Sequence, residues 1–224
     1  MHPEPNQIYI LAHHGTCKYY KKKIDESGFA PSRGTKHWLG DGVYFFREDW
    51  EQAKTWARLK SRSLQQRKQF DDFKDYQVYV SRTSFWVPEN AFLNLDSQTG
   101  LSAFVKFTNA FYRKAKEAGI NPKLDVSKKG FVQNHLLFQS LPDEVKLIQR
   151  TFPVENKYFD DEKNFPFSLI GFVPIKKGKG NTRGEEVVKR GNDYFRKTPA
   201  LHGQQLVVRD PSLLKEASIS WSAC

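Results

Sequence analysis

The segment LGDGVYFF, residues 39–46, joins a glycine-rich turn to a run of β-branched and aromatic residues. Its two glycines flank an aspartate, which is typical of turns, whereas residues 43–46 favour an extended strand. Shortly afterwards Asp49 can serve as the N-cap of an amphipathic helix, which we predict over residues 49–68. The sequence therefore predicts a turn, a short strand and a long helix in direct succession.

The predicted helix has two different faces. One face is apolar and carries Trp50, Ala53, Trp56 and Ala57. The other face is basic, with residues at spacing i, i+4 and i+8: Lys54, Arg58 and Arg62. Residues 52–70 contain six basic residues and no acidic one. Such a stripe fits a solvated helix face and a nucleic-acid contact equally well.

The remaining pattern indicates an α+β protein. Strand-type runs occupy residues 7–12, 77–80, 145–152, 165–173 and 206–209, and a second helix is predicted over 101–118, with Gly119 as its stop. Because strands do not alternate regularly with helices, a doubly wound sheet is disfavoured. The chain shows no internal repeat and no clear linker, so we expect a single domain over residues 1–224.

Bulk composition limits the class of protein. Of the 224 residues 38% are hydrophobic, which is enough to form a core. The sequence has no run of 18 apolar residues, so we expect no membrane span. Its first residues do not form a basic segment followed by an apolar one, so we expect no secretory signal. Its two cysteines, Cys17 and Cys224, fit a reducing compartment. The expected location is the cytoplasm.

The chain is strongly basic, with 36 Lys and Arg against 25 Asp and Glu and a net charge of +11. An excess of this size attracts polyanions, such as nucleic acid or an acidic protein. Residues 175–197 contribute eight basic and three acidic residues, and residues 176–181 within them are predicted to form a loop.

Two further motifs accompany residues 39–46. Residues 13–16 (HHGT) end the first predicted strand, and residues 204–211 (QQLVVRDP) contain the last one. In this order the three motifs resemble the ADP-ribosyltransferase superfamily, in the His-Tyr-Glu branch that includes the diphtheria-toxin-like and poly(ADP-ribose)-polymerase-like enzymes. The matching positions are His14, Tyr44 and, in place of the glutamate, Gln205. The resemblance implies a split antiparallel β-sheet core with flanking helices.

The same resemblance implies NAD+ as the substrate and assigns roles to the motif residues. Cleavage of the bond between nicotinamide and ribose develops positive charge on the anomeric carbon, so the site must hold the ring and the ribose in place. The implied catalytic residues are His14, Tyr44 and Gln205. The implied NAD+-binding residues are His14 on the adenosine ribose, Gly15 at the nicotinamide carboxamide, Tyr44 stacked on the nicotinamide, Trp56 on the opposite ring face, and Thr16.

Gln205 departs from the family pattern. Its carbonyl oxygen can accept a hydrogen bond from the ribose 2′-hydroxyl but supplies no full negative charge, and such a loss costs on the order of 10²–10³ in rate. We therefore expect transfer of one ADP-ribose unit without chain elongation. Gln204 is an alternative for this position. Arginine as the acceptor is disfavoured because the Gln/Glu-x-Glu pair is absent. The general base stays open among Asp41, Asp210, Glu185 and Glu186.

The resulting hypothesis is a mono-ADP-ribosyltransferase of bacterial toxin type that modifies a nucleic acid, with RNA favoured. Lys54, Arg58 and Arg62 are the candidate nucleic-acid contacts, and an antitoxin protein or a phage-defence role fits enzymes of this kind. The alternatives are transfer to a protein side chain, or a degenerate domain that only binds RNA or a partner. No metal is expected, because adjacent strand residues such as His13 and His14 point to opposite faces.

Overall fold

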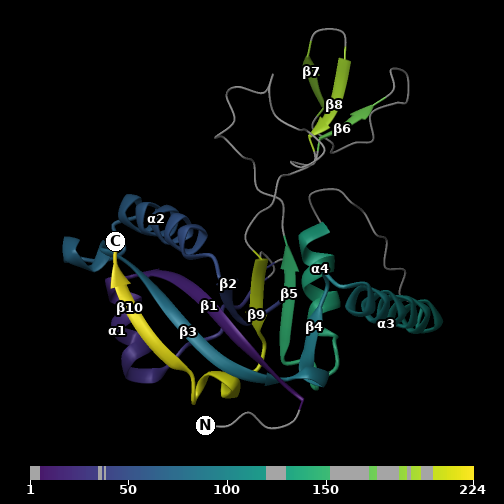
Figure 1. Ribbon diagram of the computed structural model, residues 1–224, viewed down its shortest axis with the longest axis horizontal. Coiled ribbons are helices and arrows are strands. Elements are labelled where there is room, and N and C mark those ends of the chain that lie inside the picture. Colours follow the sequence, from purple (N-terminus) through teal and green to yellow (C-terminus); the bar gives the residue numbers. More distant parts are fainter. Residues whose placement is uncertain are drawn as a thin grey trace. The chain divides into compact units, whose positions relative to one another are not determined.

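The structure is a computed structural model that describes residues 6–34, 37, 39–119, 130–151, 172–175, 187–190, 193–197 and 204–224. Its contacts divide the chain into two compact units (Figure 1). The larger unit combines Met1–Arg150 with Gln204–Cys224, and the smaller unit is Thr151–Gly203. Whether the chain folds as a single domain stays a prediction.

A mixed sheet of seven strands forms the centre of the larger unit. In spatial order its strands are β10 (Ser218–Ala223), β3 (Val78–Pro88), β1 (Gln7–Cys17), β2 (Val43–Arg47), β9 (Gln204–Val208), β5 (Leu147–Thr151) and β4 (Phe92–Asn94). The pairs of β1 with β2 and β3, of β3 with β10 and of β2 with β9 are antiparallel, and β4 runs parallel to β5. Together with the helices this sheet confirms the α+β class.

The core lies where the apolar side chains of these strands meet. β1 and β3 pair over eleven residues each, from Gln7 opposite Pro88 to Cys17 opposite Val78. Ile10, Phe45 and Leu206, from three neighbouring strands, are fully buried. Burial of each such side chain stabilises the fold by about 1.5–3 kcal/mol. This packing fixes the register of the strands that carry the three sequence motifs.

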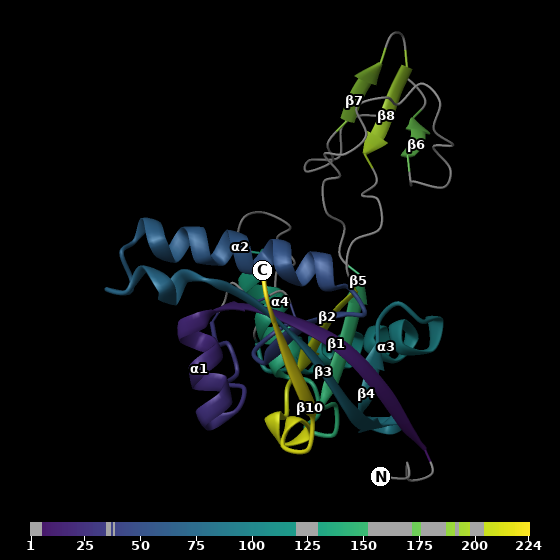
Figure 2. The ribbon, with the colours of Figure 1, turned by 60° about the vertical axis from the view of Figure 1, so that its left-hand side comes forward.

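Four α-helices accompany the sheet: α1 (Lys18–Ser27), α2 (Trp50–Gln66), α3 (Gln98–Glu117) and α4 (Gly130–Gln139). Figures 1 and 2 both show α2 lying over β1 and β3. The predicted N-cap is confirmed, because the Asp49 side chain accepts a hydrogen bond from the Gln52 amide at 2.9 Å. The buried stripe of α2 is narrower than expected and consists of Ala53, Ala57 and Ser61. Trp56 is 55% exposed and lies outside it.

Predicted and observed elements agree best where the signal is local. The helix predicted over 101–118 is α3, and Gly119 follows it with a φ of 74°. The strands predicted over 7–12 and 77–80 continue well beyond those limits, to Cys17 and Pro88. The helices α1 and α4 and the strands β4, β10, β7 (Val187–Arg190) and β8 (Asp193–Lys197) were not predicted. The loop predicted over 176–181 lies outside the described residues.

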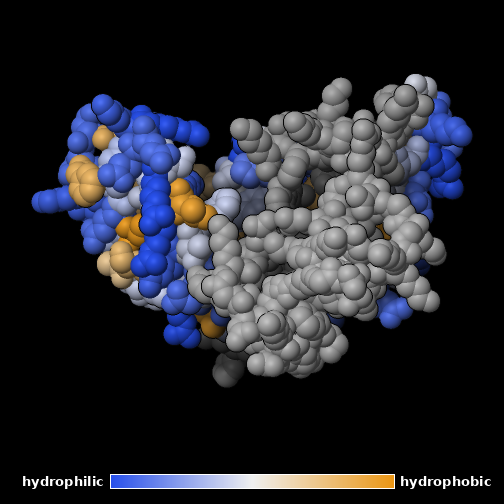
Figure 3. Space-filling model, turned by 90° about the horizontal axis from the view of Figure 1, so that it is seen from above, coloured by the Kyte–Doolittle hydropathy of each residue, from blue (hydrophilic) through white to orange (hydrophobic). Residues whose placement is uncertain are grey.

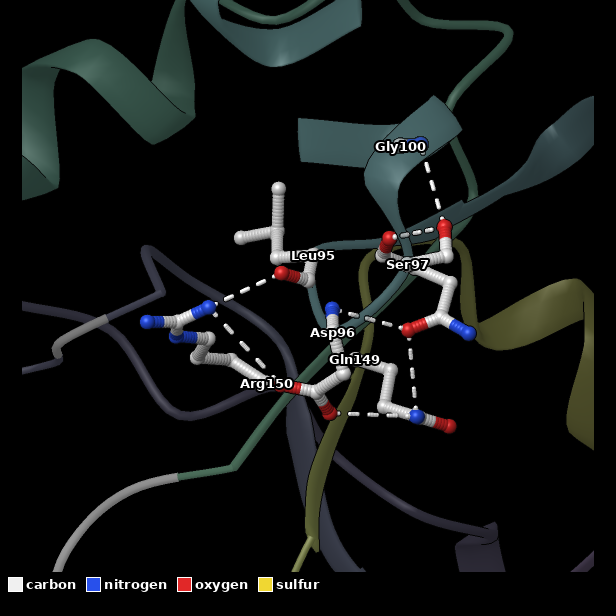
Figure 4. A network of polar contacts seen from close by, with 7 residues as sticks. Leu95, Asp96, Ser97, Gly100, Gln149 and Arg150 are labelled. Carbon is white, nitrogen blue, oxygen red and sulfur yellow. Dashed lines mark hydrogen bonds and ion pairs between the residues drawn. The ribbon is translucent and has the colours of Figure 1, made fainter. Parts of the chain in front are cut away.

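A buried amide, that of Gln149, links β5 to β2, β4 and the turn after β4, and Figure 4 shows its contact with Asp96 in that turn. Gln149 on β5 is 2% exposed, and its Oε1 accepts a hydrogen bond from Arg47 Nη1 at 2.6 Å. Its Nε2 donates to Asn94 and Asp96 at 3.2 Å each. Ser97, in the same turn, caps α3 by accepting from the Gly100 amide. Satisfied buried polar groups of this kind fix one arrangement of the strands.

The smaller unit contains a three-stranded antiparallel sheet with the order β6, β8, β7. These strands are β6 (Phe172–Ile175), β7 (Val187–Arg190) and β8 (Asp193–Lys197), so they carry part of the basic region. The run predicted over 165–173 overlaps β6, and its earlier residues lie outside the described part. None of the helices in the described ranges has the length and apolar character needed to cross a membrane.

Candidate functional site

β1 and β2 pair over only two positions and then separate. Ala12 lies opposite Arg47 and His13 opposite Phe46, whereas β1 continues to Cys17. A cavity of about 700 Å³ is lined by residues of both strands beyond this point, which is a size typical of small-molecule sites. The described lining residues are His14, Gly15, Ser32, His37, Tyr44, Phe45, Phe46, Trp56, Leu59, Lys60, Ser63, Leu64, Arg67 and Gln205.

The imidazole of His14, on β1, forms a hydrogen bond with the backbone of the neighbouring strand β2. Its Nδ1 lies 2.8 Å from the carbonyl oxygen of Tyr44. A carbonyl only accepts, so Nδ1 must carry the proton and donate. The pKa of His14 is lowered to about 4, mainly by burial and to a smaller extent by the positive charge of Lys60, while the hydrogen bond to Tyr44 acts in the opposite direction. At neutral pH the ring is therefore uncharged, and its Nε2 is an acceptor for a ligand hydroxyl.

The Tyr44 hydroxyl forms two hydrogen bonds with the backbone of the preceding turn. It donates to the Gly40 carbonyl at 2.7 Å and accepts from the Leu39 amide at 3.2 Å. Burial raises the pKa of Tyr44, so the phenol stays protonated at neutral pH. The ring lies 5.3 Å from the His37 ring, at an interplanar angle of 34°. Tyr44 therefore offers the cavity an aromatic surface and is not placed to transfer protons.

Gly15 has a packing role that the sequence analysis did not foresee. A Cβ at this position would lie 1.9 Å from the Ala53 carbonyl oxygen and 2.9 Å from the Ala57 Cβ. The missing side chain therefore lets α2 pack directly against β1. This close approach brings the residues of α2 to the cavity.

Gln205, from the third motif, lies opposite Phe46 in the pairing of β2 with β9, and both residues line the cavity. Gln204 is exposed and is not among the lining residues. Of the two glutamines left open by the sequence, Gln205 is thus the one that shares the cavity with His14 and Tyr44. Its side chain brings a neutral carboxamide to the site.

α2 contributes five residues to the cavity, among them the predicted Trp56 and the unpredicted Lys60, and Arg67, which directly follows the helix, contributes one more. Trp56 and Leu59 are 55% and 56% exposed. Seen from above, in Figure 3, apolar side chains lie among hydrophilic ones over the part of the surface where Figure 1 places α2. No aspartate or glutamate is among the described lining residues. The charged lining is therefore cationic.

Four predicted site residues do not reach the cavity. Thr16 is 1% exposed and lies in the pairing of β1 with β3. Lys54, Arg58 and Arg62 are not lining residues, and the Lys54 ammonium lies 4.4 Å from the Trp50 ring centre. At about 100° per residue, the middle of this basic stripe lies roughly 170° around α2 from the middle of its cavity face.

The carboxylates considered as general bases are engaged elsewhere or lie outside the described residues. Asp41 accepts from the Gly34 amide at 3.0 Å and lies 3.8 Å from His135. Asp210 accepts from the Ser212 amide and pairs with Lys146 at 3.0 Å. Glu185 and Glu186 are not described. Neither Asp41 nor Asp210, the two described carboxylates, lines the cavity, so the structure assigns the role of base to neither.

His13 and His14 point to different partners, as alternation along a strand requires. His13 Nδ1 donates to the Ser81 carbonyl at 3.1 Å, on the neighbouring strand β3. Within the described ranges no group of three or more His, Cys, Asp or Glu side chains could hold a metal ion.

No family model matches the chain, and no solved structure matches it. A segment of 58 residues, 25% of this chain, is 40% identical to a protein of Methanocaldococcus jannaschii that is described as uncharacterized. The match covers 27% of that protein, so the chain spans about a quarter of the relative's length, and its description names no activity.

Proposed function

We propose that the protein has the ADP-ribosyltransferase fold and transfers a single ADP-ribose unit from NAD+ to a nucleic acid, with release of nicotinamide. One observation carries this proposal. His14, Tyr44 and Gln205 come from three motifs far apart in the sequence, and all three line the same cavity. These are the positions for which the resemblance implies contacts with NAD+.

In the proposed reaction the bond between the anomeric carbon and nicotinamide breaks, and the nitrogen leaves with the bonding electrons. The acceptor then attacks the anomeric carbon and loses a proton. Tyr44 and Trp56 provide aromatic surfaces for the nicotinamide ring. The His14 Nε2 can accept a hydrogen bond from a ribose hydroxyl, and the Gln205 carbonyl oxygen can accept one from the 2′-hydroxyl beside the reacting carbon.

RNA is the favoured acceptor because the chain carries a net charge of +11. Lys54, Arg58 and Arg62, the predicted nucleic-acid contacts, lie on the side of α2 away from the cavity, so they would bind the nucleic acid outside it. A protein acceptor is the alternative outcome of the test. A role as a toxin with an antitoxin partner, in the cytoplasm, belongs to the same proposal.

A second candidate function is a domain that binds NAD+ or RNA without efficient transfer. Two observations favour it: Gln205 supplies no negative charge, and the described lining of the cavity contains no carboxylate. Without a carboxylate the positive charge on the anomeric carbon is stabilised less.

The test is incubation of the full-length protein with NAD+ labelled in the adenylate phosphate and separate pools of RNA, DNA and cell protein. We expect label on RNA, and none with Tyr44→Ala as the matched inactive variant. Label on protein alone would move the proposal to a protein-directed transferase. No label, with NAD+ binding detected by calorimetry, would favour the second candidate. No binding at millimolar NAD+ would refute an NAD+ site.

A further inference from the structure

α2 and the residue that directly follows it place two cations in the cavity, and the reaction above gives neither of them a role. Lys60 and Arg67 both line it, and neither forms an ion pair with a residue in the described part of the chain. Unpaired cations that line a cavity without a described carboxylate favour an anionic ligand.

The surroundings of Lys60 support this reading. Much of its side chain is exposed, but its ammonium lies 5.2 Å from the centre of the Tyr20 ring, within the range of a cation–π contact. Desolvation lowers the pKa of Lys60, and its charge in turn lowers the pKa of His14. An anion bound beside Lys60 would stabilise the charged ammonium.

We propose that Lys60 and Arg67 form a diphosphate-binding site and hold the dinucleotide by its two phosphates. The inference rests on the proposed function, because NAD+ supplies the diphosphate. Arg67 offers a planar guanidinium that suits bidentate contact with phosphate oxygens, and Lys60 offers a point charge. Ser63 lies between them in the sequence, also lines the cavity and can donate its hydroxyl.

The order of residues along α2 agrees with the layout of a dinucleotide. Trp56 precedes Lys60 by four residues, or about 6 Å along the axis, and Arg67 follows after seven, or about 10 Å. Along the helix an aromatic side chain thus comes first and two cations follow. Along NAD+ the nicotinamide ring and its ribose come first and the diphosphate follows, so the two orders match. Two long side chains separated by this distance can contact one diphosphate from either side.

A nucleic-acid backbone offers the same phosphate chemistry. The position of the two cations favours NAD+ over a nucleic acid, because Lys60 and Arg67 line the same cavity as His14. Arg58 and Arg62, the candidate nucleic-acid contacts, lie on the other side of α2. The experiment therefore measures both ligands.

The test is isothermal calorimetry on the full-length protein with NAD+, which carries a diphosphate, and with nicotinamide riboside, which carries no phosphate. Lys60→Met and Arg67→Gln should each weaken NAD+ binding by about 10- to 100-fold, the range for a lost charge-assisted hydrogen bond. Both should leave the riboside affinity within about twofold. Lys68→Met removes the same charge beside Arg67 at a position that does not line the cavity, so its NAD+ affinity should stay within about twofold.

Thermal melts verify that each variant is folded. Arg67 follows the last residue of α2 and is exposed, so Arg67→Gln keeps the test decisive if Lys60→Met unfolds.

Equal losses for NAD+ and riboside would overturn the inference. So would unchanged NAD+ binding in both variants while Tyr44→Ala abolishes it. Weaker RNA binding with unchanged NAD+ affinity would assign the cations to a nucleic-acid backbone and also overturn it. If the wild type binds ADP through Lys60 and Arg67 but shows no NAD+ binding, the diphosphate site stands and the proposed function fails. Binding of neither overturns both.

Discussion

Replacing Gly15 by alanine tests the contact on which the cavity depends. The added Cβ would lie 1.9 Å from the Ala53 carbonyl oxygen, whereas ordinary contacts begin at 3.4 Å. α2 would have to withdraw by about 1.5 Å, because the obstacle is backbone and cannot rotate away. Overpacking a close contact costs roughly 1–3 kcal/mol and occasionally more. We expect a loss near 3 kcal/mol in the free energy of unfolding.

The assay is thermal unfolding followed by circular dichroism. In a chain of this length each kcal/mol shifts Tm by about 2–4 °C, so Gly15→Ala should melt roughly 6–12 °C below the wild type. Gly119→Ala is the matched control, since its Cβ would meet no described atom within 4 Å. Its φ of 74° should cost only about 1–2 kcal/mol.

Displacing α2 should also impair the chemistry. Trp56 and Lys60 would move with the helix, and a misplacement near 1 Å can lower a rate on the order of 10²-fold. NAD+ hydrolysis should therefore fall in Gly15→Ala and not in Gly119→Ala. A Gly15→Ala protein that melts within 2 °C of the wild type (roughly the effect of 1 kcal/mol) would refute the account of why this position is glycine.

Three further outcomes follow from the site. Gln205→Glu should raise NAD+ hydrolysis by up to about 10²–10³-fold by adding negative charge near the anomeric carbon, and Gln204→Glu should not; a reversed result in a nicotinamide-release assay would exchange the two positions. Tyr44→Phe should lower the free energy of unfolding by about 1–3 kcal/mol in urea titrations, because it leaves the Leu39 amide and the Gly40 carbonyl without their partner; an unchanged midpoint would contradict those bonds. His14 has a folded pKa of about 4, below its unfolded value of 6.5, so the unfolded state binds the extra proton between these limits. The contribution of His14 to the free energy of unfolding is therefore fully present above about pH 6.5, and up to about 3 kcal/mol of it is lost as the pH falls toward 4. His14→Gln should remove this loss, and urea titrations between pH 4 and pH 6.5 would then show a flatter dependence of stability on pH.

Much of the site was predictable because its motifs are local. The turn before Tyr44 and the N-cap at Asp49 depend on neighbouring residues alone, and both were found. The choice of Lys54, Arg58 and Arg62 followed from helical spacing, which groups residues on a face but does not say where that face points. Lys60 and Arg67 were visible only as members of a basic run.

The sequence by itself determined the α+β class, the turn, strand and helix around Tyr44 and the three motifs, because composition, capping and spacing act over a few residues. Tertiary structure alone decided which side of α2 meets the cavity and which glutamine lies there. Those choices depend on contacts between distant segments. The missing side chain of Gly15 lets Ala53 and Ala57 face β1, and that orientation turns Lys60 toward His14 and Arg58 away from it.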